Sequence, residues 1–493
     1  KALCLNTGAQ NTASGGYALA ENTTGVGNVA TGYGSALCNT VGACNTVSGY
    51  QALRQNASGT RNIAIGACAL YQNVASINVA IGYKANALNT TGDSQVAIGY
   101  QAMCSATTGG NNVAIGPDTM RLTTTGSVNV AIGKDSMQCN TTGTQNVAVG
   151  VKALQSASTD NYNTAVGYCA AYSNKGGDYQ TAIGYEALKL NTTAGYKTAV
   201  GSLALKNSTS GVYDVAVGYS ALRQTTTGSK NTAVGTFALI NNTTGVCNTA
   251  MGYNALGSST TAGCNTAVGI QALKTNTTGF MNTAVGMDAM YSSTTSRHST
   301  AIGYTALFST TSGRYNTALG RSALYSLTTA YGNTASGYSA LQQTTSGAHN
   351  AATGYQSMLS NTTGACNTAI GFSSLRSNTT AHYNTAVGGC ALYANTTGTN
   401  NAAVGGAALK SNTTGTRNTA SGYYAMCSNT TGQYNTAMGA YSMKLTTTGC
   451  SNVAIAYASV HNNTTGCNNI GIGYQAVYAN TTGRSNVAVG FQA

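Results

Sequence analysis

Two carboxylates are the first side chains whose spacing could support catalysis. Asp118 and Asp135 stand 17 residues apart in a chain that repeats with a 17-residue period. If each repeat is one coil, they lie in neighbouring coils, near the roughly 5 Å separation of a retaining glycosidase pair. Both should be exposed, with Lys134 and Lys152 close by, so we expect a solvated charge cluster and not an enzyme. A polysaccharide-processing β-helix enzyme is a remote alternative, because it needs clustered acids, bases or metal ligands.

The fourteen cysteines offer a second kind of chemistry. Two pairs share a repeat position one period apart, namely Cys247 with Cys264 and Cys450 with Cys467. Neighbouring coils place such Cα atoms at the strand spacing of ~4.8 Å, inside the ~4.4–6.8 Å window of a disulfide. An oxidising, extracellular location would suit these bonds. Alternatively, each cysteine is a small packing residue with a free thiol. The four histidines never share a position in adjacent repeats, so we expect no metal site and no cofactor.

The tripeptide Asn-Thr-Thr matches the acceptor of N-glycosylation. The candidates are Asn22, Asn89, Asn140, Asn191, Asn242, Asn276, Asn361, Asn378, Asn395, Asn412, Asn429, Asn463 and Asn480. The same turn position is Thr in "LTTTG" (122–126) and Ser in "SSTTAG" (258–263). The motif therefore has a second interpretation, a turn that accepts any small hydrogen-bonding side chain, and glycosylation would depend on the host.

These residues are positioned by a repeat that fills the chain. The last position of the pattern "NTAVG" recurs 29 times from Gly15 to Gly490, as glycine 28 times and as Ala456 once. We call this residue the anchor and number each repeat from it. No segment is left for a separate domain, so we predict one continuous array over residues 1–493. Both ends fall inside a repeat, and we expect a segment of a longer chain.

One step of the repeat is a residue short. Gly66 and Gly82 are 16 residues apart, whereas the other anchors follow at 17. We predict that the turn near Ala75 and Ser76 absorbs the deletion and leaves both strands in register.

The repeat positions predict a parallel β-solenoid. Position −4 is Asn in 24 of 29 repeats, −2 is Ala with two exceptions, −1 is mainly Val or Ile, and +4 is Leu or Met nearly everywhere. "NTAVGY" has β character and "NTTG" has turn chemistry. Since side chains in a strand alternate, Asn, Ala and Gly share one face and Thr, Val and Tyr the other. We predict an all-β parallel β-solenoid or β-roll of 29 coils, one 17-residue repeat per coil, with an asparagine ladder and a length of roughly 140 Å.

The side chains at −1 should form an apolar ridge along the coils. A contiguous apolar patch above a few hundred Å² is unusual on a monomer. We expect other copies of the chain to cover it, in a trimer or a filament, with a modestly apolar monomer as the alternative. The candidate interface residues are Ile115, Ile132, Val149, Val166, Ile183 and Val200. The variable +1 position, which includes Lys134 and Arg321, should lie at the rim of the contact.

Composition narrows the function classes. Charged residues make up 6% of the chain, and the formal net charge is +13. No apolar run approaches ~18 residues, so we expect no membrane span. Basic residues are scattered at fewer than one per repeat, unlike the stripe of a nucleic-acid-binding protein, and we expect no nucleic acid partner. The charge fits a mildly basic surface or attraction to anionic glycans.

The motif resembles the repeats of two kinds of surface fibre. "NxA[VI]GxxA" resembles the head repeats of trimeric autotransporter adhesins, which implies a β-roll of three chains with the Val/Ile column facing the threefold axis. The longer "NTAVGYxALxxNTTG" is similar to shaft repeats of phage tail-fibre and related surface-fibre proteins. The resemblance covers all 29 repeats, although the adhesin repeats are usually shorter.

We therefore expect a structural protein, a stiff oligomeric β-solenoid shaft in a surface adhesin, tail fibre or secreted filament. Its location would be extracellular, at a cell or virion surface. The expected partner is the same chain, with cell-surface glycans as a second class. The alternative is a module whose turn ridge or tyrosine column binds glycans, ice or a mineral. A regular threonine array would favour ice, but position −3 changes to Val from Val79 to Val147.

Overall fold

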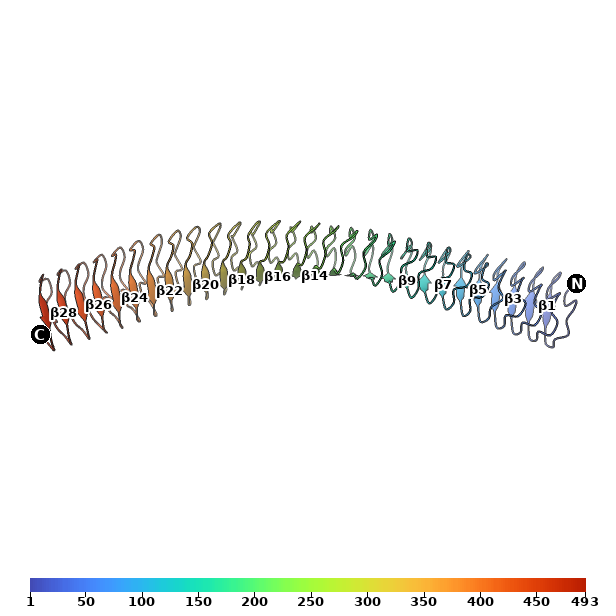
Figure 1. Cartoon of the computed structure of the whole chain (residues 1–493), viewed down its shortest axis with the longest axis horizontal. Coiled ribbons are helices and arrows are strands. Elements are labelled where there is room, and N and C mark those ends of the chain that lie inside the picture. Colours follow the sequence, from blue (N-terminus) through green and yellow to red (C-terminus); the bar gives the residue numbers. More distant parts are fainter. The chain divides into compact units, whose positions relative to one another are not determined.

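Short strands and turns make up the chain. A computed structural model describes residues 1–493. It contains twenty-nine three-residue strands and no helix, and it divides into two compact units, Lys1–Cys247 and Asn248–Ala493 (Figure 1). The first unit contains β1 (Thr12–Ser14), β2 (Val29–Thr31), β3 (Thr46–Ser48), β4 (Ile63–Ile65), β5 (Val79–Ile81), β6 (Val96–Ile98), β7 (Val113–Ile115), β8 (Val130–Ile132), β9 (Val147–Val149), β10 (Thr164–Val166), β11 (Thr181–Ile183), β12 (Thr198–Val200), β13 (Val215–Val217) and β14 (Thr232–Val234). The second contains β15 (Thr249–Met251), β16 (Thr266–Val268), β17 (Thr283–Val285), β18 (Thr300–Ile302), β19 (Thr317–Leu319), β20 (Thr334–Ser336), β21 (Ala351–Thr353), β22 (Thr368–Ile370), β23 (Thr385–Val387), β24 (Ala402–Val404), β25 (Thr419–Ser421), β26 (Thr436–Met438), β27 (Val453–Ile455), β28 (Ile470–Ile472) and β29 (Val487–Val489).

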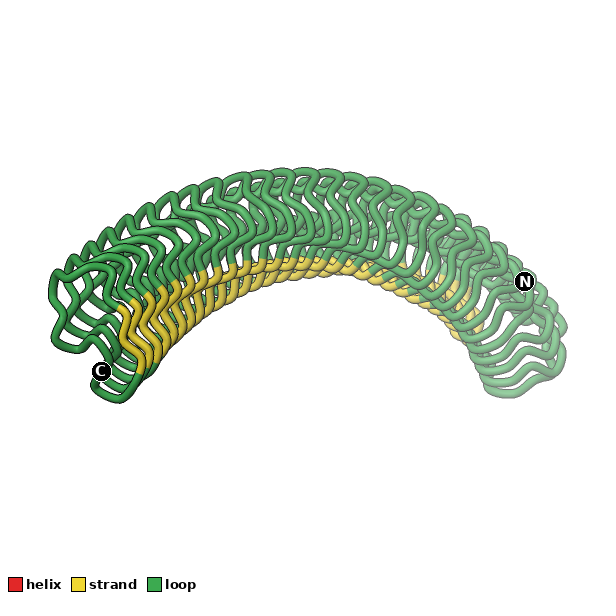
Figure 2. The backbone as a smooth tube through the Cα atoms, turned by 60° about the vertical axis from the view of Figure 1, so that its left-hand side comes forward, coloured by secondary structure: helices red, strands yellow, loops and turns green.

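Within each unit, strands one repeat apart pair in parallel. Thr164 of β10 lies opposite Thr181 of β11, and Thr266 of β16 lies opposite Thr283 of β17. In Figure 2 the strands of each unit lie side by side, and loops close every coil. Backbone hydrogen bonds between coils continue beyond the strands, as in the bond from Leu188 N to Ala204 O at 3.0 Å. The predicted all-β parallel β-solenoid with one 17-residue repeat per coil is confirmed.

The interior of each coil is filled by alanine and by leucine or methionine. Ala165 at position −2 and Leu188 at +4 are fully buried, as are Ala267 and Met290 in the second unit. Alternation along each strand points the −2 side chain inward and leaves its two neighbours on the outer face. Burial of each leucine side chain contributes roughly 1.5–3 kcal/mol relative to exposure. The predicted assignment of the two strand faces is confirmed.

The anchor glycine is fixed by its backbone conformation and by the closeness of the next coil. Gly150 has a φ of +134°, and a Cβ added to it would stand 2.5 Å from the carbonyl oxygen of Gly167. A side chain there would have to push the coils apart, which is a form of overpacking. Ala456, the single alanine anchor, is held at a φ of +100°, which L-residues avoid.

The predicted asparagine ladder at position −4 is present and buried. The backbone N and Nδ2 of Asn129 donate to Asn112 Oδ1 at 3.0 and 3.2 Å, and Nδ2 also donates to Gly143 O at 2.8 Å. Asn418 of the second unit bonds Asn401 in the same way. Because buried polar groups need partners, each amide both satisfies itself and joins its coil to a neighbour.

A second asparagine ladder lies at position +7, in the "NTTG" turn, and was not predicted. Asn395 Nδ2 donates to Asn378 Oδ1 and to Gly398 O, both at 3.0 Å. The following threonine bonds the next coil, since Thr396 Oγ1 donates to Thr413 O at 3.1 Å. The motif therefore links coils through two successive side chains, and the second threonine of the turn is the one that faces solvent.

The short repeat is accommodated as predicted. Strand β4 pairs with β5 in direct register, Ile63 opposite Val79. In the turn between them, Asn73 Nδ2 donates to Ala75 O at 2.8 Å, two residues on, where other turns bond a residue three positions on. The deletion therefore falls between Asn73 and Ala75, and Ala75 takes the place of the turn glycine.

Candidate functional site

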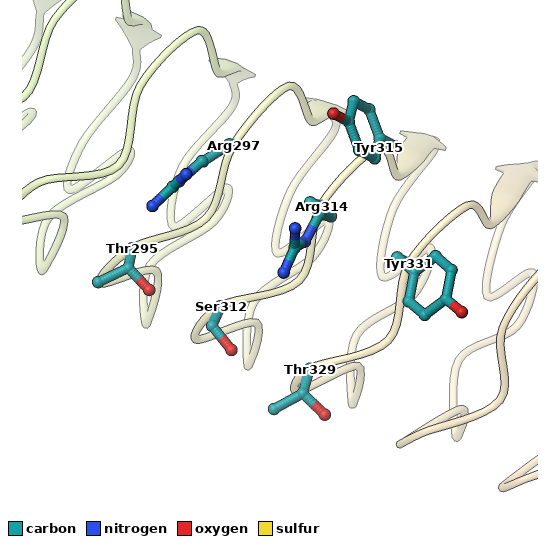
Figure 3. A pocket seen from close by; sticks show the side chains of 7 residues that line it. All are labelled: Thr295, Arg297, Ser312, Arg314, Tyr315, Thr329 and Tyr331. Atoms are coloured by element: carbon teal, nitrogen blue, oxygen red, sulfur yellow. The ribbon is translucent and has the colours of Figure 1, made fainter.

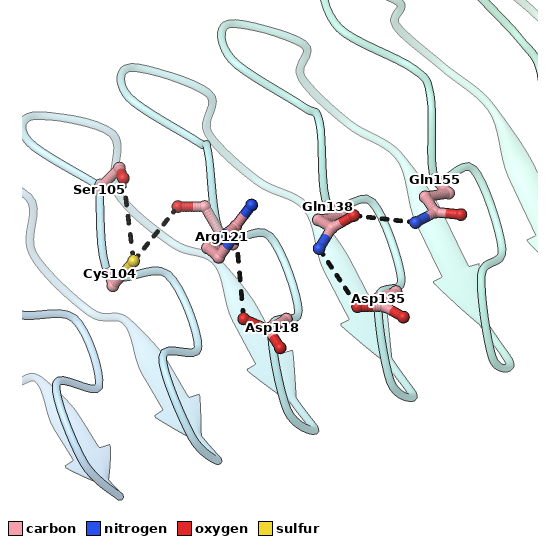
Figure 4. Close-up of polar contacts among 7 residues, drawn as sticks. All are labelled: Cys104, Ser105, Asp118, Arg121, Asp135, Gln138 and Gln155. Carbon is pink, nitrogen blue, oxygen red and sulfur yellow. Dashed lines mark hydrogen bonds and ion pairs between the residues drawn. The ribbon is translucent and has the colours of Figure 1, made fainter.

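Each of the two carboxylates considered for catalysis is bonded by the side chain three residues after it (Figure 4). Asp118 Oδ1 lies 3.9 Å from Arg121 Nε, and Asp135 Oδ1 accepts a hydrogen bond from Gln138 Nε2 at 3.2 Å. The expectation that both are exposed is wrong, because Asp118 is half-buried and Asp135 is only 9% exposed. Gln155 Nε2 continues the row by donating to Gln138 Oε1 at 2.8 Å. The two carboxylate contacts therefore lie within single coils, and only the bond between Gln155 and Gln138 joins neighbouring coils.

The histidines stand apart from one another and contact aromatic rings or the backbone. His298 stacks on Tyr315 with ring centroids 5.2 Å apart, and His461 stacks on Tyr478 at 5.1 Å. His382 Nδ1 accepts a hydrogen bond from the backbone of a neighbouring coil. The chain contains no group of three or more His, Cys, Asp and Glu side chains that could hold a metal ion.

All fourteen cysteines are free thiols in the structure. Cys450 and Cys467 lie in neighbouring coils of the second unit, where the backbone N of Cys450 donates to Cys467 Sγ at 3.2 Å. Cys247 ends the first unit and Cys264 belongs to the second, and both are exposed. The two disulfides remain predictions. Cys450 and Cys467 lie in neighbouring coils, as a disulfide between them requires.

The structure buries the asparagines considered for glycosylation. Twelve of the thirteen have no exposed surface, and Asn480, in the last turn, is half-buried. Their Nδ2 atoms are donors of the +7 ladder, as described for Asn395. A glycan on such a nitrogen would replace a donated hydrogen inside the coil, so the folded chain does not present these twelve as acceptors. The second interpretation of the motif, a hydrogen-bonding turn, explains the buried Thr123 and Ser259 at the same position.

The candidate interface residues lie where the sequence placed them, on the outer face of the strands. Ile132 is 37% exposed and Ile183 39%, while Ile115, Val149, Val166 and Val200 are half-buried by neighbouring coils. In β5–β9 the −3 side chains are valines too, so both outward positions of five consecutive strands are aliphatic. The rim residues Lys134 and Arg321 are exposed.

Comparison with known proteins gives no family. No family model matches the chain, and no curated protein is similar to it. No helix in the structure is long and apolar enough to cross a membrane.

Two ionisable residues replace asparagine in the −4 ladder of neighbouring coils, and both are buried. Lys197 Nζ donates to Asn191 Oδ1 and Ser208 Oγ, each at 2.7 Å, and burial lowers the pKa of Lys197 to about 8. Asp214 Oδ1 accepts from Asn231 N at 2.9 Å, but Oδ2 has no partner. Burial raises the pKa of Asp214 to about 6.

Asp214→Asn is expected to stabilise the chain at neutral pH. The folded pKa of Asp214 exceeds the ordinary value of 3.8, so its contribution to stability is present below about pH 4 and is lost as the pH rises through about 6. Asp160 is also buried, both of its carboxylate oxygens lack a partner, and burial raises its pKa to about 6. It therefore lowers the stability of the chain over the same pH range. An amide does not titrate and can donate a hydrogen bond as other ladder asparagines do. We expect roughly 1–3 kcal/mol more free energy of unfolding near pH 7.

Urea unfolding followed by circular dichroism between about pH 4 and pH 7 measures this effect. The wild-type chain should lose stability across that range, and Asp214→Asn should lose less, with Asp160 responsible for the remainder. Equal pH dependence of the free energy of unfolding in the two chains would show that ionisation of Asp214 does not destabilise the fold.

Proposed function

We propose that the protein is structural and forms the stiff shaft of an extracellular fibre, in an adhesin, a tail fibre or a secreted filament. The bonding between coils carries this proposal. In each unit a strand ladder, two buried amide ladders and a threonine column link neighbouring coils. In such a repeat architecture each coil contacts only its neighbours, so the number of coils sets the length of the rod. The resemblance of the repeat to surface-fibre shafts supports the same role.

The outer face of β5–β9 supports assembly with other copies of the chain. We call this surface the apolar strand face. It consists of Val79, Ile81, Val96, Ile98, Val113, Ile115, Val130, Ile132, Val147 and Val149. These side chains are half-buried or, for Ile132, exposed, and they contain no polar atom. A second copy offers the same aliphatic face with the same coil spacing, so their ridges can interdigitate and release water from both surfaces.

Ile115→Lys is expected to disrupt this assembly. It places a charge in the middle of the apolar strand face, where association would have to remove its hydration without a partner. We expect the dissociation constant to rise roughly tenfold or more. Thr125→Lys is the matched control, because Thr125 is exposed at the turn of the same repeat.

Sedimentation velocity across a concentration series measures the effect. The wild-type chain and Thr125→Lys should form a defined oligomer, and Ile115→Lys should sediment as a monomer at the same concentrations. A monomeric wild-type chain, or equal association of the two variants, would contradict assembly through this face.

A further inference from the structure

A polar groove crosses three consecutive coils on the turn side of the second unit. It has a volume of about 700 Å³. Figure 3 shows Arg297 and Arg314 on successive coils, with the hydroxyl groups of Thr295, Ser312 and Thr329 in a row beside them and Tyr331 on the third coil. All six side chains are exposed. The groove therefore offers two cations, three hydroxyl groups and a phenol in an order that repeats from coil to coil.

The two arginines are direct neighbours in the stack. The backbone of Arg297 pairs in parallel with that of Phe280 on one side and Arg314 on the other. The guanidinium of Arg297 lies over the Phe280 ring, 4.9 Å from its centroid. No other two arginines of the chain occupy the same position in consecutive repeats. Two like charges at this spacing repel each other, and the repulsion is relieved by an anion bound between them.

Two other cations stacked in neighbouring coils, Lys189 and Lys206, are neutralised by a carboxylate, unlike this pair. Lys189 and Lys206 share Glu186, with Nζ to oxygen distances of 2.6 and 2.7 Å, and these bonds hold the pKa of Glu186 below its usual value. Arg376 donates to the hydroxyl of Tyr393 in the next coil at 3.1 Å.

The guanidinium groups of Arg297 and Arg314, by contrast, make no hydrogen bond or ion pair within the chain. The second unit has nine basic residues and a single carboxylate, Asp288, which occupies position +2 and does not line the groove. The pair is therefore free to bind an anion from outside.

We propose that this groove binds an anionic polysaccharide lying along the stack. Its sulfate or carboxylate groups accept hydrogen bonds from Arg297 and Arg314, which suit planar, paired oxygen acceptors. Its sugar hydroxyls bond the row formed by Thr295, Ser312 and Thr329, and a sugar ring packs against Tyr331. The ligand is extended because the same donors recur at the ~4.8 Å coil spacing. A nucleic acid fits less well, since the basic residues do not continue as a stripe along the coils. The site is independent of the proposed shaft role.

The test compares two double variants of the full chain that lose equal charge. Arg297→Gln with Arg314→Gln removes the pair, and Arg376→Gln with Arg417→Gln removes two arginines that do not stack on each other. Isothermal titration calorimetry with a sulfated glycosaminoglycan oligosaccharide gives the affinity of each chain. Its desulfated form, inorganic sulfate and a single-stranded DNA of matched charge are the comparison ligands. Circular dichroism checks that the substitutions leave the fold intact.

We expect the groove variant to lose affinity for the sulfated oligosaccharide roughly tenfold or more, and the control variant less than about threefold. The desulfated form should bind weakly to all chains. Three results would overturn the proposal: no binding to the wild-type chain, equal losses in the two variants, or DNA binding as tight and as dependent on the pair. Equal losses in the two variants would show that binding depends on net charge alone. Equally tight DNA binding that depends on the pair would show that the groove accepts any polyanion.

Discussion

Gly388→Val is expected to unfold the coil that contains it. Gly388 has a φ of +131°, and an added Cβ would stand 2.6 Å from the carbonyl carbon and oxygen of Gly405 in the next coil. The backbone strain costs about 1–3 kcal/mol and the forced separation of the coils a further ~1–3 kcal/mol. Because a coil is supported only by its neighbours, a loss of this size at one coil interrupts the stack there.

The adjacent residue supplies the matched control. A Cβ added to Gly389 meets nothing within 4 Å, so Gly389→Val should leave stability nearly unchanged. Hydrogen exchange with mass spectrometry resolves the coils individually and does not require two-state unfolding. We expect peptides spanning β22–β24 to lose protection in Gly388→Val and to keep it in Gly389→Val. Similar protection in both variants would mean that the anchor tolerates a side chain and that the coils are less tightly stacked than described.

Asn395→Ala should have a comparable effect, through lost hydrogen bonds. The substitution removes three hydrogen bonds and leaves the buried Asn378 Oδ1 without a donor, whereas Gly398 O keeps the bond from Asn384 Nδ2 and Asn412 Nδ2 keeps its bond to Gly415 O. The unsatisfied buried oxygen costs about 1–3 kcal/mol and each of the other two lost bonds about 0.5–1.5 kcal/mol, so we expect a loss of about 2–6 kcal/mol.

Thr397→Ala is the control for Asn395→Ala, since Thr397 lies two residues on in the same turn and faces solvent. Limited proteolysis followed by mass spectrometry should show new cleavage near residue 395 only in the asparagine variant. Absence of cleavage there, with unchanged thermal unfolding, would indicate that water replaces the missing amide without cost.

The sequence predicted the coil because three columns carry its signal directly. Asn at −4, Ala at −2 and the anchor glycine vary so little that the strand, its inward face and the ladder follow from the residue types alone. The conformation of the turns does not. Gln101 and Met103, at +2 and +4 of one repeat, have φ values of +54° and +50°, and nothing in their side chains indicates a left-handed backbone. Stacking on the neighbouring coils, not local preference, holds such residues there.

The candidate site was harder to predict because buried and exposed positions share the same residue types. Position +7 is Asn in most repeats and Thr or Ser in others, such as Thr123 and Ser259. These residue types are typical of a solvent-exposed turn, but the side chains at this position are buried. Arg297 and Arg314 do not stand out when basic residues are counted per repeat. Aligning the basic residues by position shows two arginines at −6 in consecutive repeats, and this signal is present in the sequence.

Electron microscopy of the purified 493-residue chain tests the central claim, that every repeat adds one stacked coil to a shaft. Twenty-nine strands at the ~4.8 Å spacing predict a thin rod with a contour length of roughly 140 Å. The contour length does not depend on the angle between the two units, and side-by-side association of copies thickens the rod without shortening it. A rod of that length would support the account. Round, compact particles, or rods of half the length, would contradict it.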